Sequence, residues 1–261
     1  MMKVHLHGVG VAGSGLEGWA ACREVLAARA PWSGQALRVP APAILPAAER
    51  RRCNAASRLA LAAAEDALAG CEWPLAELAT VFTSADGDGA VTHALCESFA
   101  APEPDVSPTQ FHNSVHNAPA GYWGIATKSK RPSTSIAADQ DSFAAGLFEA
   151  AVQATLDRGP VLLVAFDLPL PHPLALMRPR SHDFAAALLL SGEPRGRPLA
   201  SLALRLEPGA APSALPAGLG ALADNPAARA LPLLSALAHG GTAEIRLGAV
   251  GARQLAVRCE R

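Results

Sequence analysis

The chain has 261 residues and half of them are hydrophobic, so it is long and apolar enough to bury a sizeable core. Lys and Arg number 22 against 23 Asp and Glu, a balance that excludes a strongly basic nucleic-acid-binding protein. Only 5% of the residues are aromatic, which argues against a stacking platform for single-stranded nucleic acid.

The cysteines and the apolar segments suggest where the protein works. No uncharged apolar run reaches the roughly 18–20 residues that a membrane helix needs, and residues 1–10 lack the apolar stretch of a signal peptide. The cysteines are odd in number, scattered and never spaced as CxxC, so we expect neither a disulfide framework nor a zinc site. A reducing cytoplasm is the expected location.

The N-terminal region predicts a strand followed by helices. Residues 3–11 alternate like a strand and end in a glycine-rich turn, and residues 16–28 read as a helix. A proline-rich connector covers residues 40–46. Residues 50–69 give the strongest helix signal in the chain, ended by Gly70.

The remaining elements alternate between strands and helices. Strands are predicted over 78–84, 133–138, 161–166, 184–190, 199–206, 244–247 and 254–259. Helices are predicted from the turn 86–89 to about Phe99 and over 115–126, 143–156 and 231–237, with a polar loop around Pro108 and a connector over 208–226. This order favours an α/β domain whose sheet is mixed at its C-terminal end.

Two patterns suggest small-ligand sites and are better explained structurally. The spacing Gly8-x-Gly10-x-x-Gly13 after a strand resembles a dinucleotide-binding turn, but no second strand ending in an acid follows, so we interpret it as a tight turn and expect no cofactor. His112 and His116, four residues apart, would share one helix face. No further ligand lies at helical spacing, so structural histidines are favoured and no metal is expected.

The corner formed by residues 139–142 is the most informative local feature. A side chain between a strand and an apolar helix projects at the helix N-terminus, where enzymes place a Ser or Cys nucleophile. Asp139, Asp141 and Ser142 are explained as caps of that helix. Gln140 has no acidic proton and cannot be acylated. Helix capping by its neighbours does not explain why a glutamine, Gln140, occupies the tip of this corner.

The segment SIAADQDSFAAGL, residues 135–147, resembles the nucleophile segment of β-ketoacyl synthases, with Gln140 at the position of their catalytic cysteine. Residues 116–135 resemble the stretch that precedes it, and the whole resemblance covers residues 3–207. It implies a thiolase-like fold, layered α-β-α with a mixed sheet, of which this chain has the N-terminal half only. Residues 208–261 are expected to add a connector, a short helix and a strand pair to a single domain.

The resemblance also bears on catalysis. The family's second half supplies two histidines and a lysine that act on the malonyl unit, and no matching segment exists here. Residues 239–242, His-Gly-Gly-Thr, resemble the family's H-G-T motif but precede what reads as a closing hairpin, so we interpret the match as coincidence. The replacement of cysteine by glutamine is typical of chain length factors.

The short form resembles the chain-length-factor-like proteins of aryl polyene pathways. The resemblance implies a non-condensing subunit that pairs with a full-length β-ketoacyl-ACP synthase, works with an acyl carrier protein and closes part of the acyl tunnel. Two copies could also pair with each other, giving a homodimer when the chain is expressed alone. The alternatives are a malonyl-thioester decarboxylase and a scaffold protein without a role in the tunnel.

The resemblance assigns residues to two surfaces. The expected tunnel-lining residues are Gly87, Asp88, Gly89, Thr92, Phe111, His112, His116, Tyr122 and Phe143. The expected dimer-interface residues are Asn117, Ser133, Thr134, Ser135, Ile136, Ala137, Ala138 and Asp139. A large apolar pocket at a subunit interface, lined by residues 87–92, would distinguish a tunnel-shaping subunit from a scaffold protein and favour the former.

Overall fold

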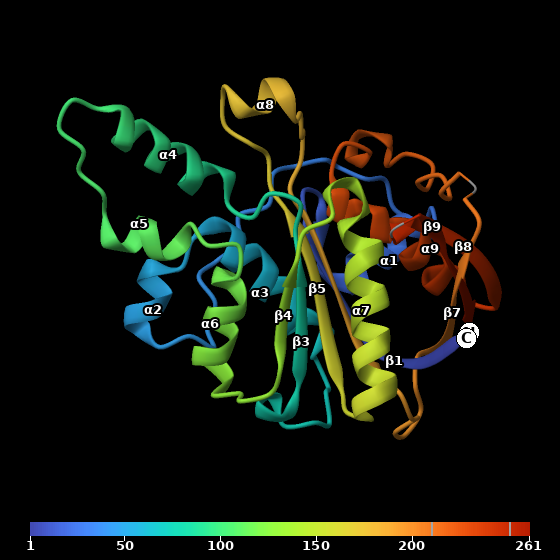
Figure 1. Ribbon diagram of the computed structural model, residues 1–261. Coiled ribbons are helices and arrows are strands. Elements are labelled where there is room, and N and C mark those ends of the chain that lie inside the picture. The colour runs from blue at the N-terminus through green and yellow to red at the C-terminus, as the bar shows by residue number, and fades with distance from the viewer. Residues whose placement is uncertain (210, 251) are drawn as a thin grey trace.

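The computed structural model describes residues 1–209, 211–250 and 252–261. Strands from both ends of the chain form one 9-stranded sheet in the order β4-β3-β5-β6-β1-β7-β9-β8, with β2 paired to β1 (Figure 1). The strands are β1 (Met2–Gly13), β2 (Leu16–Glu17), β3 (Ala79–Thr83), β4 (Ser133–Ile136), β5 (Val161–Asp167), β6 (Phe184–Ser191), β7 (Ala200–Glu207), β8 (Thr242–Val250) and β9 (Arg253–Glu260).

Helices cover both faces of this sheet. They are α1 (Gly18–Leu26), α2 (Ala47–Arg52), α3 (Ala55–Ala67), α4 (Gly89–Ala100), α5 (Pro108–Asn113), α6 (Ala118–Thr127), α7 (Ser142–Asp157), α8 (Leu174–Met177) and α9 (Leu231–His239). Short 3₁₀ turns are η1 (Leu75–Glu77), η2 (Asp139–Asp141), η3 (Gly220–Leu222) and η4 (Pro226–Ala230). No helix in the described part of the chain is long and apolar enough to cross a bilayer.

The sheet is mixed, as predicted. β4, β3 and β5 run parallel, whereas every other pairing among the described strands is antiparallel. All residues of β5 and β6 are buried, because helices pack on both faces of these two central strands. Because β4, β3 and β5 are parallel, their carboxyl ends lie together at one end of the sheet.

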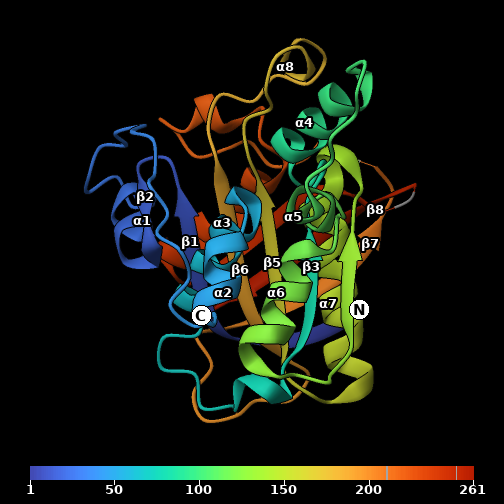
Figure 2. The same ribbon diagram turned by 90° about the vertical axis from the view of Figure 1, so that its left-hand side faces the viewer.

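Two hydrophobic cores lie on opposite faces of the sheet, which confirms the layered α-β-α arrangement. α1, α7 and α9 contribute to one core, together with the inner face of the hairpin β8–β9. α3 and α6 form the other core, over β3, β5 and β6. Figure 2 shows α6 and α2 in front of the sheet and α7 behind it, with the projecting α4 above them.

The glycines of the first strand do not form the predicted turn. β1 continues through Gly8 and Gly10 to Gly13 and pairs with β6 along this stretch. A Cβ atom at Gly8 would come within 1.9 Å of the Ala67 carbonyl oxygen, and one at Gly10 within 2.0 Å of the Ala63 carbonyl oxygen. The glycines let the backbone of α3 lie directly on β1, so the expectation of a glycine turn was wrong.

The predicted helix over residues 50–69 is two helices. α2 ends at Arg52 and α3 begins at Ala55, because Cys53 and Asn54 adopt extended backbone conformations. The Asn54 side chain accepts a hydrogen bond of 2.9 Å from the Ser57 N–H and caps α3. An asparagine inside an alanine-rich helical pattern thus begins a new helix.

The two histidines spaced by four do not share a helix. His112 lies in α5, which occupies the expected polar loop around Pro108, and His116 lies in the turn before α6. The predicted helix 115–126 begins only at Ala118. Within residues 1–209, 211–250 and 252–261, no group of three or more His, Cys, Asp or Glu side chains is placed to hold a metal ion.

Candidate functional site

The corner around Gln140 is built as a tight turn. β4 ends at Ile136, and Asp139 takes a left-handed conformation with φ of 48°. The buried Ser142 hydroxyl accepts a hydrogen bond of 3.0 Å from the Ala138 N–H and donates one of 2.7 Å to the Asp139 carbonyl oxygen. Ser142 therefore holds the turn closed, with Gln140 exposed at its apex.

Asp139 and Asp141 were predicted to cap α7 with their side chains, and in the structure they do not. Asp141 occupies the N-cap position without a side-chain cap hydrogen bond. Its carboxylate lies against β8, where a Cβ atom at Gly248 would come within 2.0 Å of Asp141 Oδ1. Asp139 instead forms an ion pair with Arg178. Both acids tie the corner to distant parts of the chain.

A chain of charged residues, not identified from the sequence, connects the corner to the sheet. Arg178 Nε lies 3.1 Å from the Asp86 carboxylate, and the same carboxylate forms an ion pair with Arg180. Arg180 also lies 3.3 Å from the fully buried Asp167. Asp86 follows β3 and Asp167 ends β5, so the acids sit at the same edge because these strands are parallel.

Asp167 is the most strongly perturbed acid of this network. Its Oδ1 accepts hydrogen bonds of 2.9 Å from the Ser84 hydroxyl and from the Ala85 N–H. Burial nevertheless raises its pKa to about 6, although Arg180 and both hydrogen bonds act in the opposite direction. Acids that follow neighbouring apolar strands were the sequence signal that could have revealed this cluster.

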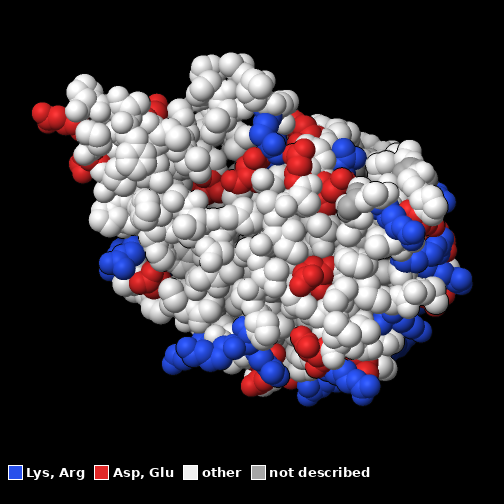
Figure 3. All heavy atoms as spheres, viewed as in Figure 1, with Lys and Arg blue, Asp and Glu red and all other residues white. Residues whose placement is uncertain are grey.

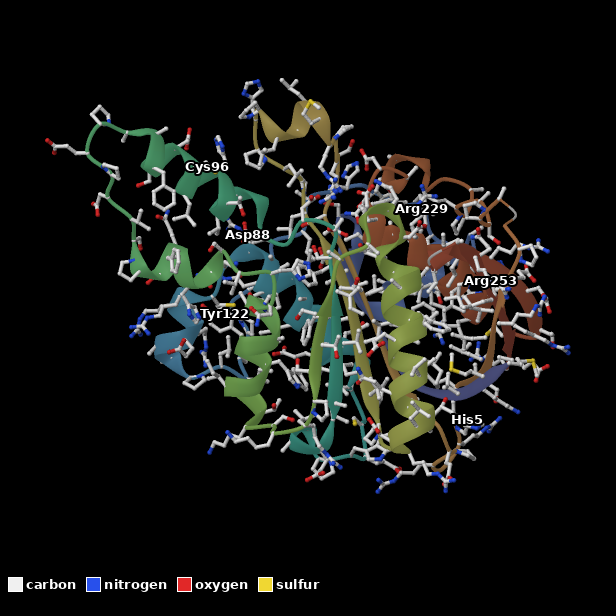
Figure 4. The ribbon with its side chains drawn as sticks, in the orientation of Figure 1. His5, Asp88, Cys96, Tyr122, Arg229 and Arg253 are labelled. Atoms are coloured by element: carbon white, nitrogen blue, oxygen red, sulfur yellow. The ribbon has the colours of Figure 1, made fainter. Side chains whose placement is uncertain are left out.

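Gln140 lines a cleft of about 380 Å³ at the carboxyl ends of the strands. The lining residues are Asp139, Gln140, Met177, Arg178, Pro179, Arg180, Ala223, Asp224 and Arg229. Figure 4 shows Arg229 beside the upper end of α7. These described lining residues include no Cys, Ser, His or Lys, and their ionisable groups are the carboxylates of Asp139 and Asp224 and the guanidinium groups of Arg178, Arg180 and Arg229.

The expected tunnel residues 87–92 form the start of α4 (Figure 4 labels Asp88). Asp88 caps the helix by accepting a hydrogen bond of 3.0 Å from the Val91 N–H, and the exposed Thr92 hydroxyl donates to the Asp88 carbonyl oxygen at 3.1 Å. A Cβ atom at Gly89 would come within 2.2 Å of Leu170 Cδ2. Gly89 therefore packs against the loop that carries α8.

Four of the other expected tunnel residues, Tyr122, Phe111, His112 and Phe143, lie at two places in the fold. Tyr122 is buried in the core under α6 (Figure 4), where its hydroxyl donates a hydrogen bond of 2.9 Å to Asn113 Oδ1. Phe111 and His112 are exposed on α5, with Phe111 61% accessible, and the His112 ring lies edge-on to the Tyr122 ring with 6.0 Å between the ring centroids. Phe143 is fully buried in the core on the opposite face of the sheet. The structure does not bring these side chains to one wall.

A hollow of about 610 Å³ does bring expected tunnel and interface residues together at the edge of β4. Its lining residues are His116, Asn117, Ala120, Gly121, Ser133 and Ser135. His116 Nε2 lies 2.9 Å from the Ser84 carbonyl oxygen, and Gly87 lies under the His116 ring. Residues 87–92 do not themselves line the hollow.

The expected interface residues of β4 form an open sheet edge. β4 pairs only with β3 among the described strands, and the Pro132 and Ile136 carbonyl oxygens accept bonds from the β3 side. Because hydrogen-bonding directions alternate along a strand, the backbone groups of Ser133, Ser135 and Ala137 point away from β3. Figure 3 looks onto this edge and shows a broad uncharged surface over it, with Lys and Arg gathered at the lower and right-hand margins.

Known proteins resemble the chain in family and in fold. A family model described as "Beta-ketoacyl synthase, N-terminal domain" matches residues 19–243. No curated protein sequence matches the chain. A complex of a ketosynthase with its chain length factor from Xenorhabdus doucetiae aligns with a TM-score of 0.73 at 24% identity, covering 100% of both chains.

Two further structures have the same fold at lower identity. The ishigamide ketosynthase/chain length factor aligns with a TM-score of 0.73 at 15% identity over 98% of both chains. A type II PKS acyl carrier protein in complex with its ketosynthase bound to the hexaketide aligns with a TM-score of 0.71 at 10% identity over 99% of both chains. With the family match extending from α1 into β8, the chain belongs to the β-ketoacyl synthase N-terminal-domain family and has its thiolase-like fold.

Proposed function

We propose that this chain is the non-condensing, chain-length-factor-type partner of a full-length β-ketoacyl-ACP synthase. The observation that carries the proposal is Gln140 at the apex of the corner where this family places its nucleophile. An amide side chain cannot form the acyl thioester that condensation requires. The absence of His and Lys from the described lining of the adjacent cleft supports the same conclusion and disfavours the decarboxylase alternative.

The open edge of β4 is the proposed contact with the partner. The other sheet edge, β8, has Glu244 and Arg246 on its outer surface, and Arg205 pairs with Glu244 at 2.8 Å. Charged side chains of this kind prevent strands from pairing edge to edge. β4, with the sequence Ser-Thr-Ser-Ile, has no charged side chain. We therefore assign pairing to β4, and the contact to the expected interface residues, which are Asn117 and residues 133–139.

The partner would perform condensation while this chain contributes part of the acyl tunnel. The hollow beside His116 lies at the proposed interface, where a partner would convert it from an open depression into an enclosed volume. Each CH₂ group of the growing acyl chain that is buried in the tunnel stabilises the bound state by about 0.8 kcal/mol. At a closed end of the tunnel no further CH₂ group can be buried, so the chain stops growing there. We propose an acyl-carrier-protein-bound polyene or polyketide chain as the substrate of the complex, and the cytoplasm as its location.

Co-expression tests the proposal. A tagged copy of this chain is expressed with each full-length β-ketoacyl-ACP synthase of the same genome, and the purified material is analysed by size exclusion and by condensation assays with acyl and malonyl carrier-protein thioesters. We expect a one-to-one complex with one synthase, and product lengths that change when this chain is omitted. Failure to bind any synthase would refute the proposal.

An edge variant locates the contact. Ser135→Pro removes an N–H that points away from β3 and leaves the β3–β4 ladder intact, so it should abolish the complex while preserving the fold. Thr242→Asp, at the exposed start of β8, is the matched control on the other edge and should leave the complex unchanged. An unchanged complex with Ser135→Pro would place the interface elsewhere.

A further inference from the structure

A cluster of ionisable and aromatic side chains lies at the end of the sheet opposite the Gln140 corner. It is formed by the segment that follows α3 and by the loop between β6 and β7, which Figure 1 shows at the lower end of the sheet, whereas α7 begins at the upper end. The cluster surrounds a pocket of about 120 Å³. The lining residues are His7, Gly70, Cys71, Glu72, Trp73, Leu189, Arg195, Gly196 and Arg197.

Trp73 holds two of these side chains in place. The Arg195 guanidinium lies over the Trp73 ring, 5.1 Å from its centroid, and the His7 ring lies edge-on to the same indole with 4.8 Å between the ring centroids. Trp73 packs in turn against the core that α3 forms. Stacking occupies the flat face of a guanidinium and leaves the N–H groups at its edge free to bind a ligand.

The pocket has more positive than negative charge. The side chains of Arg195 and Glu72 are 51% and 71% exposed and lie 3.9 Å apart, so water screens this pair and its attraction is weak. Arg197 forms no ion pair with an acid among the residues that the structure describes. Two arginines that line one pocket therefore have N–H groups available for a negatively charged ligand.

His7 adds a group that can take up a proton. Its Nε2 lies 2.8 Å from the Ser191 hydroxyl oxygen, and that hydroxyl donates a hydrogen bond to the Glu193 carbonyl oxygen. Because the hydroxyl has only one proton to donate, Nε2 carries the proton of the neutral ring. Nδ1 is then the nitrogen that becomes protonated when the imidazole is charged.

The surroundings of His7 oppose its positive charge when the pocket is empty. Burial lowers the pKa of His7, the charges of His5 and Arg195 lower it further, and Glu72 acts in the opposite direction. The remaining ionisable side chain at this end of the pocket is Cys71, whose thiol lies 3.6 Å from the Trp73 carbonyl oxygen. An anion bound beside the ring would raise the pKa of His7.

We propose that this pocket binds a small anion, a carboxylate or phosphate group, between Arg195 and Arg197. The planar fork of an arginine matches both groups, since each can accept two parallel N–H bonds. The pocket is smaller than the ~150 Å³ of an engineered cavity that holds benzene, so it admits one such group and excludes a bulky ligand. The site is separate from the Gln140 corner and does not depend on the proposed function.

Titration of the full chain with inorganic phosphate and with acetate, each at constant ionic strength, tests the proposal. The NMR signal of His7, assigned with a His7→Gln variant, reports both the affinity and the pKa of this side chain. We expect a saturable change with at least one of the two anions and a higher pKa of His7 in its presence. The anion that binds more tightly identifies the group that the pocket takes. No saturable change with either anion would overturn the proposal.

Arg197→Gln should weaken binding at least about fivefold, because it removes a charge-assisted contact. Arg253→Gln is the matched control, since Arg253 is exposed at the start of β9 (Figure 4) and does not line the pocket. This variant should bind the anion with wild-type affinity. Equal weakening by the two substitutions would show a general response to surface charge and would also overturn the proposal. No partner chain takes part in the experiment, so the proposed function stands or falls separately.

Discussion

Gly10 of β1 lies directly against the backbone of Ala63 in α3, so that a Cβ atom at residue 10 would come within 2.0 Å of the Ala63 carbonyl oxygen. This contact brings α3 onto the centre of the sheet, where it packs over β1, β5 and β6. The packing of this helix on the sheet therefore depends on a close approach of two backbones.

Gly10→Ala should destabilise the protein by at least about 3 kcal/mol, because neither the strand nor the carbonyl oxygen has room to move. The measurement is the free energy of unfolding in urea. A variant that does not fold at all would also agree with this prediction. Gly124→Ala, at an open position of α6, is the control and should stabilise the isolated chain by roughly 0.5–1 kcal/mol. Equal effects of the two substitutions would contradict the packing argument.

The wild-type chain should not be acylated by an acyl-carrier-protein thioester, because Gln140 provides no nucleophile. Intact mass after denaturation should show the unmodified chain. Since Cys96 is exposed, the assay is best run in a Cys96→Ser background. A stoichiometric adduct that survives denaturation would mean that another residue acts as the nucleophile.

Gln140→Cys should restore slow acylation and no condensation. The new thiol stands at the N-terminal end of α7, where the helix dipole favours the thiolate. Among the described residues that line the cleft, there is no histidine to act on malonate. Gln140→Ala is the matched control and should give no adduct. Formation of a carbon–carbon bond by the cysteine variant alone would show that a catalytic base has been missed.

Asp167 should lower the stability of the fold as the pH rises from 4 to 6. Its pKa in the folded protein, about 6, lies above the unfolded value near 3.9, so its stabilising contribution is complete only below the unfolded pKa and is lost as the pH passes the folded pKa. The loss is on the order of 2–3 kcal/mol.

Asp167→Asn removes this titration while it keeps an oxygen acceptor for Ser84 and Ala85. Urea unfolding at several pH values should show wild type losing stability relative to the variant between pH 4 and 6, with a constant difference above pH 7. A difference that stays constant over the whole range would show that Arg180 and the two hydrogen bonds hold the pKa of Asp167 near its ordinary value.

Tyr122→Phe should cost about 1–3 kcal/mol, because it leaves the buried Asn113 Oδ1 without its donor. Asn113 in turn donates a hydrogen bond of 2.8 Å to the Arg52 carbonyl oxygen, so the loss affects the contact between α6 and α2. Thr92→Val, which removes an exposed hydroxyl hydrogen bond, is the control and should change stability by less than about 0.5 kcal/mol. Chemical denaturation of both variants gives the comparison.

The periodicity of apolar residues located most helices and strands, because each of these elements buries the face on which its apolar side chains lie. The apolar run at β5 and the corner before α7 were predictable, as was the mixed character of the sheet. The break at Asn54 was missed because the helical pattern continues on both sides of it. The network of ion pairs from Asp139 through Arg178, Asp86 and Arg180 to Asp167 was missed because these residues come from separate loops and strand ends.

The sequence by itself determined the family resemblance and the chemistry of the corner, because both depend on residue identity at consecutive positions around Gln140. Only the tertiary structure decided what the glycines and the edge strand do. Gly8 and Gly10 are explained by α3, whose Ala67 and Ala63 lie against them although they are distant in the sequence, and at Gly121 a Cβ atom would meet nothing within 4 Å. Such contacts join residues with no local pattern in common, so they are fixed only when helices and strands pack together.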